Sequence, residues 1–149
     1  MTVAFSSEVD KLLHRAFAKA REAHHLSMTV EHLVLEMLGE EAVLRYLRGC
    51  GTNVDALRAL LEAKVASFRT AQIETVETQP NGEFSRVVRR TIEDAGKQRR
   101  ESIVLHDVFL AILEEPDGYA ASLLVAQTSN PAAFEALRKE RERVAKRSP

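Results

Sequence analysis

Cysteine is nearly absent from this sequence: Cys50 is the single one among 149 residues. A lone cysteine excludes an internal disulfide framework and is typical of a reducing compartment. Long apolar runs are also missing, since no stretch reaches the roughly 18 residues of a membrane span. The start, MTVAFSSEVDKLL, has no basic leader and is interrupted by charges, unlike a secretory signal. We therefore expect a cytoplasmic protein without a membrane span.

An excess of charge of one sign is lacking as well. The formal net charge is −1 and aromatic residues make up 5%, whereas a domain that binds nucleic acid normally carries a basic surface. Basic residues do gather at 89–90, at 99–100 and in the end RKERERVAKR, which we interpret as a solvated last helix that frays into a linker or tail. Nucleic-acid binding through these residues stays a minor alternative, and we expect no nucleic-acid partner.

The motifs of common active sites are missing too. Neither GxGxxG nor GxxxxGKS/T occurs, so nothing predicts a nucleotide cofactor or ATP hydrolysis by this chain. Cys50 lies between two glycines with no neighbouring histidine, which favours an incidental thiol over a nucleophile. His24, His25 and His32 form the richest group of ligand-type residues, but their spacing is not HExxH. We interpret them as polar residues near helix ends, with adventitious metal binding as the alternative, and expect no enzyme activity, cofactor or metal site.

What the sequence does contain is helical periodicity. From Val9 onward, apolar residues recur at the i, i+3, i+4 and i+7 spacing of one helix face, behind a serine cap. Thr29 begins a second helix that stops before Gly39, and a short third helix covers about 42–48. A fourth helix follows a cap at position 52 or 53. The residues expected to face inward from it are Leu57, Leu60, Leu61 and Val65.

The stretch 68–80 breaks this rhythm and separates two similar halves. It is polar, and its β-branched residues show no helical period, so we interpret it as a surface linker in which no short strand is expected to be structural. After it the pattern returns. A shift of 75 residues places caps on caps, as with Ser6 on Asn81, and apolar residues on apolar residues, as with Phe17 on Ile92. A shift of 77 carries the remainder.

Two copies of one helical unit, each with an apolar face that the other can cover, predict an all-α fold. We expect one domain over 1–149, an eight-helix pseudo-twofold bundle made of two four-helix repeats. Its parts would be repeat one over about 6–67, the linker over about 68–80, repeat two over about 81–143 and a basic tail over 138–149. The polar positions diverge between repeats, because Glu31 pairs with His106 and His32 with Asp107. Such positions are either free of packing demands or given different partners in each half.

Several runs of residues resemble the Clp amino-terminal domain family. They are AFAKARE at 16–22, MTVEHL at 28–33, ETQP at 77–80, FSRVVRR at 84–90 and YAASLL at 119–124. The resemblance spans about 6–137, MTVEHL is its most specific part, and the ClpA branch of the family is the most similar. It implies an eight-helix fold of two Clp repeats that receives adaptors or substrates for an AAA+ unfoldase working with the ClpP protease.

The same resemblance implies partners and the residues that face them. The partners would be a ClpS-like adaptor or unfolded protein substrates, and the Clp ATPase ring in cis or in trans. The residues would be Glu31, at an acidic position of the family, and Asn81, at the head of the fifth helix, with Leu26, Thr29 and His32 around them.

Two positions depart from the family pattern. Leu26 follows the histidines where an acidic residue is usual, and His106 stands in place of a second acid. The chain is interpreted either as an excised amino-terminal domain or as a free-standing regulator that competes for adaptors or docks on a Clp motor. The basic end would be the linker to the motor in the first case and a tail in the second.

Overall fold

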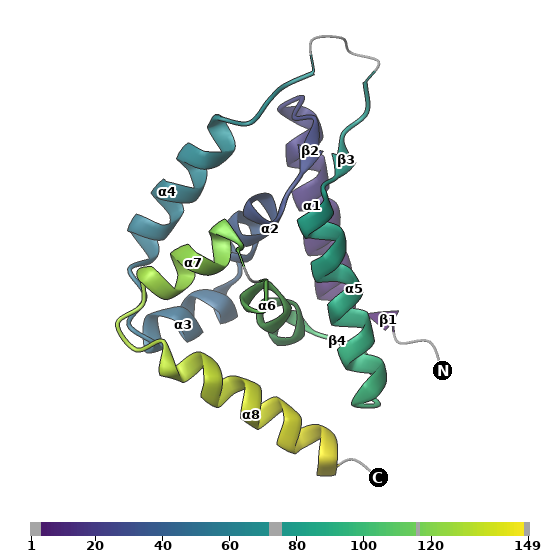
Figure 1. Cartoon of the computed structure of the whole chain (residues 1–149), viewed down its shortest axis with the longest axis vertical. Helices are drawn as coiled ribbons and strands as arrows, with labels where there is room; N and C mark the ends of the chain where they lie inside the picture. Colours follow the sequence, from purple (N-terminus) through teal and green to yellow (C-terminus); the bar gives the residue numbers. More distant parts are fainter. Residues whose placement is uncertain (1–3, 72–75, 116, 148–149) are drawn as a thin grey trace.

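The computed structural model describes residues 4–71, 76–115 and 117–147, so residues 72–75 of the predicted linker and 148–149 of the predicted tail lie outside the described residues. Within the described residues it is 67% helical, and eight helices and four two-residue strands follow one another (Figure 1). None of the described helices is long and apolar enough to cross a membrane.

The predicted all-α, eight-helix pseudo-twofold bundle is confirmed. The helices are α1 (Ser7–Glu22), α2 (Val30–Met37), α3 (Glu41–Gly49), α4 (Val54–Ala66), α5 (Gly82–Lys97), α6 (Leu105–Leu113), α7 (Tyr119–Ala126) and α8 (Ala132–Arg147), and the strands are β1 (Ala4–Phe5), β2 (Ser27–Met28), β3 (Gln79–Pro80) and β4 (Ser102–Ile103).

Helices begin where the predicted caps place them. In each case the side chain of the cap accepts a hydrogen bond from the backbone N–H three residues further on, which satisfies one of the free donors of the first turn. The caps that do so begin α1, α2, α4 and α5; they are Ser6, Thr29, Asn53 and Asn81.

The four short strands join the two repeats reciprocally. Strand β1, before α1, pairs in parallel with β4 of the second repeat, and β3, before α5, pairs in parallel with β2 of the first. The shift of 75 residues carries β1 onto β3 and β2 onto β4, so the exchange obeys the pseudo-twofold symmetry. The expectation that no structural strand lies in 68–80 was wrong at its end. There Gln79–Pro80 gives the backbone of β2 a partner that buried peptide groups require.

Helices α1 and α5 also end in the same way, at the start of the connection that follows each of them. His24 and Arg99, which are 75 residues apart, both adopt the left-handed conformation, with φ of 58° and 54°. The following backbone N–H groups, of His25 and Arg100, reach back 3.0 Å to the carbonyl oxygens of Ala20 and Ala95. These bonds satisfy carbonyl groups that the helix ends leave free.

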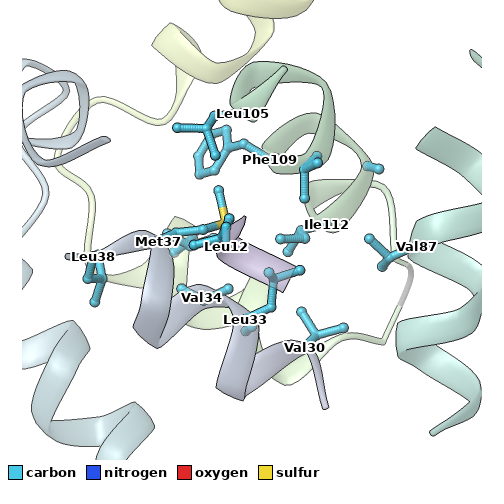
Figure 2. Close-up of a cluster of buried hydrophobic side chains, with 14 of the residues drawn as sticks. Leu12, Val30, Leu33, Val34, Met37, Leu38, Val87, Leu105, Phe109 and Ile112 are labelled. Atoms are coloured by element: carbon cyan, nitrogen blue, oxygen red, sulfur yellow. The ribbon is translucent and has the colours of Figure 1, made fainter. Parts of the chain in front are cut away.

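The hydrophobic core lies where α2 and α6 meet α1 and α5. Figure 2 shows Leu12 of α1 and Val87 of α5 among side chains of the two central helices. Both central helices are buried along most of their length. Helix α6 is apolar on nearly every side, as expected of a buried helix, whereas α2 also buries Glu31, His32 and Glu36. The core residues drawn from them are Val30, Leu33, Val34, Met37, Leu105, Phe109 and Ile112.

Two residues predicted to face inward do not. Leu60 is 38% exposed and Ile92 is 41% exposed. Successive helical residues are rotated by about 100°, so one of two neighbours points inward and the other turns away. On α4 the inward residue is Leu61, which was also predicted, and on α5 it is Thr91, which was not; they are 0% and 2% exposed.

The left-handed residues generate a stability prediction. Replacing exposed His24 with glycine is expected to raise the free energy of unfolding by about 0.5 to 1 kcal/mol, because glycine removes the left-handed strain while adding some entropy to the unfolded chain. Arg99→Gly should act alike. Urea denaturation measures both. The control is His14→Gly in the middle of α1, which should lower the free energy by about 1 kcal/mol. A loss of stability in all three variants would contradict the prediction.

Candidate partner-binding face of the first repeat

A hollow of about 280 Å³ opens on the first repeat where three segments meet. They are the connection from α1 to α2, the segment that follows α4, and the residue that caps α5. We call it the loop hollow. It is lined by Leu26, Ser27, Thr29, Phe68, Arg69 and Asn81.

Backbone hydrogen bonds hold these three segments together. The N–H of Leu26 donates to the carbonyl oxygen of Arg69 at 3.0 Å, while the carbonyl oxygen of Leu26 accepts from Gln79 N–H at 3.1 Å. One step along, the N–H of Asn81 donates to the carbonyl oxygen of Met28 at 3.0 Å. The α1–α2 connection is therefore bonded on both sides, and the position of the lining residues follows from main-chain pairing.

A capping box at the start of α2 forms the inner side of the loop hollow. The hydroxyl oxygen of Thr29 accepts from the backbone N–H of His32 at 3.3 Å, and the ring Nδ1 of His32 accepts from the backbone N–H of Thr29 at 3.0 Å. Because a backbone N–H can only donate, Nδ1 carries no proton. The proton of the neutral ring is therefore on Nε2, which lies 2.9 Å from Nδ1 of His25 and donates to it.

The two histidines are buried and uncharged at neutral pH. His25 is 7% exposed and His32 is 4% exposed, and the ring of Phe68 packs against both, with centroids 5.9 Å and 5.5 Å away. Burial lowers the pKa of His25. Burial, reinforced by the neighbouring His25, lowers the pKa of His32 to about 4. Both effects disfavour the charged ring in this apolar place.

The residues singled out by the sequence fall into two groups. Leu26, Thr29 and Asn81 line the loop hollow. Glu31 and His32 do not line it, and they are 5% and 4% exposed, as buried as Thr29. Phe68 and Arg69 also line the hollow. Neither was predicted as a site residue, because both fall in the segment predicted to be a surface linker.

Glu31 lies in an acidic environment. The pKa of Glu83, in the first turn of α5, is raised by burial first, and then by the charges of Glu31 and Glu115. Glu115 itself is paired with two arginines, Arg86 at 3.0 Å and Arg90 at 3.2 Å. Within the part of the chain that the structure describes, no three His, Cys, Asp or Glu side chains gather as a metal site requires.

The second repeat fills the same capping position with a different side chain. Asp107, at the place of His32, accepts from the backbone N–H of Val104 at 2.9 Å. It also pairs with Arg100, which stands at the place of His25, and with Arg141 of α8 at 3.1 Å. The two repeats therefore differ in the pair that occupies these positions. In the first repeat two histidines are hydrogen-bonded to each other, and in the second a carboxylate is paired with an arginine.

A second hollow, of about 300 Å³, lies between the repeats, against the start of α6. It includes His106, the counterpart of Glu31, whose ring meets Tyr46 edge-on with centroids 6.4 Å apart. Most of its lining is apolar, and the residues are Glu8, Met37, Ala42, Val43, Tyr46, Val104, Leu105, His106 and Phe109. The counterparts Glu31 and His106 therefore lie in different surroundings.

The family follows from comparison with known proteins. The family model described as "Clp repeat (R) N-terminal domain" matches residues 4–127. The chain belongs to this family. A relative from Fuscovulum blasticum, described as "ClpA homolog protein", is 28% identical over 127 residues, which cover 83% of this chain and 16% of the relative. This Clp repeat chain therefore spans about a sixth of the length of that curated relative.

Solved structures show the same fold. The Hsp104 N-terminal domain from Candida albicans superposes with a TM-score of 0.80 at 12% identity, covering 93% of this chain and 91% of that one. A ClpV N-domain solved in complex with a VipB peptide superposes with a TM-score of 0.65 at 18% identity, covering 91% and 80%. At such identities the likeness is one of fold.

The buried histidine pair of this Clp repeat domain generates a pH prediction. A histidine whose pKa is lower in the folded state than in the unfolded state stabilises the fold fully above about pH 6.5. This contribution is lost as the pH falls towards the pKa that the histidine has in the folded state. Because the pKa of His32 is lowered to about 4, the free energy of unfolding should drop by about 2 to 3 kcal/mol between about pH 6.5 and about pH 4. Urea denaturation at several pH values measures the slope.

Two variants isolate the contribution of His32. His32→Gln keeps an acceptor for the capping box but removes the titrating ring, so the slope should shrink to the part supplied by His25. His14→Gln, at a ring whose side chain is 78% exposed, should leave the slope unchanged. Equal slopes in all three proteins would exclude His32 as the source.

Proposed function

We propose that this chain is a docking domain that binds segments of protein partners at the loop hollow and catalyses no reaction itself. The observation that carries the proposal is the gathering of Leu26, Thr29 and Asn81 in one hollow of a Clp repeat fold. Leu26 and Thr29 lie close together in the sequence and Asn81 lies far from both. All three were singled out by the family resemblance, and they line a hollow fixed by backbone bonds. The ClpV N-domain, which shares this fold, has been solved with a bound peptide, which supports peptide binding by such a scaffold.

In this proposal the domain serves a ClpA-type AAA+ unfoldase that works with the ClpP protease. Its partners would be a ClpS-like adaptor or unfolded substrates, which the domain holds for the ATPase ring. The ClpA homolog of Fuscovulum blasticum, of which the chain matches 16%, supports this assignment. A free-standing regulator that competes for the same adaptors is the alternative, and the same hollow would serve it.

Leu26→Arg tests the docking surface. Leu26 is half-buried in the loop hollow, so an arginine there should block an apolar side chain of the partner and weaken binding of a ClpS-like adaptor at least tenfold, a loss of about 1.4 kcal/mol. Isothermal titration calorimetry with the adaptor from the same organism measures the dissociation constant. The matched control is Val125→Arg, since Val125 is 48% exposed on α7, away from the hollow.

The outcomes separate the versions of the proposal. If the adaptor binds the Leu26→Arg variant as tightly as the unaltered domain, the docking surface lies elsewhere on the domain. No binding of the unaltered domain to any adaptor would exclude the adaptor version, and an unfolded substrate protein would then be titrated in the same way. Equal losses in Leu26→Arg and Val125→Arg would point to a general effect of added charge.

A further inference from the structure

The loop hollow carries one charge, and that charge is positive. Of its six described lining residues, Arg69 alone is charged, and it is exposed at the rim. The rim of the hollow is therefore basic.

The other polar groups of the rim are also donors. The Oδ1 atom of Asn81 accepts the backbone N–H of Phe84 at 2.8 Å. Its side-chain amide therefore has its two N–H groups left for a ligand. Ser27 adds a hydroxyl group. A guanidinium and an amide N–H group are the donors that bind a carboxylate in proteins.

The floor of the hollow is apolar and neutral. Leu26 and Phe68 are half-buried there and present carbon atoms. Phe68 is held in place by the two histidine rings behind it. Because burial lowers the pKa of both histidines, the floor adds no positive charge at neutral pH.

From these features we infer that the loop hollow binds an acidic, apolar peptide segment of the partner. One large apolar side chain fills the floor, and the side-chain carboxylate of a neighbouring Asp or Glu meets Arg69 and the amide of Asn81. A volume of about 280 Å³ lies just below the usual range of small-molecule sites, which suits a single anchoring side chain. The inference rests on the proposed docking function and adds the chemistry of the segment that docks.

Charge complementarity at an exposed rim contributes to selectivity more than to total affinity. The apolar anchor supplies most of the binding free energy, and Arg69 decides which segments are accepted. Segments with basic residues beside the anchor are rejected because they place a cation against the guanidinium.

Three labelled peptides that differ only in charge test this inference. They are GSGLEFEGSG, GSGLQFQGSG and GSGLKFKGSG, each with an amidated carboxyl end so that the side chains supply every carboxylate. Fluorescence anisotropy with the 149-residue chain measures their dissociation constants. The glutamate peptide should bind about fivefold more tightly than the glutamine peptide and still more tightly than the lysine peptide, with the difference shrinking at high salt. A glutamine peptide with a free carboxyl end separates a terminal carboxylate from a side-chain one.

Charge reversal at Arg69 provides the decisive variant. Arg69→Glu should weaken binding of the glutamate peptide about fivefold or more and should strengthen binding of the lysine peptide. Arg89→Glu, an exposed position on α5 outside the hollow, makes the same change in net charge and should leave the order of the three peptides as it is. Arg69→Gln, which removes the charge without reversing it, should fall between the unaltered chain and Arg69→Glu.

Three results would overturn the inference: tighter binding of the lysine peptide, the same affinities in Arg69→Glu as in the unaltered chain, or no binding of any peptide. None of them bears on the adaptor titration with Leu26→Arg. A failure of that titration would exclude the adaptor as partner or place the docking surface elsewhere, whereas a failure of the peptide test alone would remove only the acidic chemistry assigned to the docked segment.

Discussion

The inner side of the loop hollow depends on one hydrogen bond, from the backbone N–H of Thr29 to Nδ1 of His32. The first turn of α2 is buried, so its free N–H groups have no water to bond and require an acceptor from the protein. The ring that accepts this bond is thereby fixed in orientation and tautomer. It then fixes His25, and the two rings together support Phe68. A requirement of helix capping thus determines the inner side of the surface that we propose for partner binding.

The second repeat meets the same requirement with other chemistry. Its buried helix α6 is capped by a carboxylate, that of Asp107, and the residue behind it is an arginine. A carboxylate brings a full charge into the protein, which must be paired, whereas a neutral imidazole needs only hydrogen-bond partners. This explains why one repeat has an uncharged, apolar hollow floor beside its cap and the other has an ion-pair network that reaches α8. The pseudo-twofold symmetry preserves the geometry of the backbone, and it does not preserve the charge.

The sequence predicted features that depend on local chemistry. Caps such as Ser6 and Asn81 satisfy their own helices, and the 75-residue repeat follows from apolar periodicity, so both could be predicted from neighbouring residues. The strand β3 could not, because two residues have no period and its partner β2 lies in the other repeat. Phe68 and Arg69 were missed for the same reason. Arg69 bonds to Leu26, and Phe68 packs against His25 and His32, so the role of each comes from residues distant in the sequence. The burial of Glu31 also arises only when α2 packs into the core.

Structure and recognition are therefore divided among different residues of the same face. Thr29 and His32 are engaged in the capping box, and their replacement would disturb α2 before it affected any partner. Arg69 contributes its backbone to the fold, through the carbonyl oxygen that accepts from Leu26, while its side chain is exposed. A change of that side chain alters the charge of the rim at almost no cost in stability, because main-chain bonds do not depend on side-chain identity. Under the proposed docking function, the rim could consequently change its preferred partner while the fold stays the same.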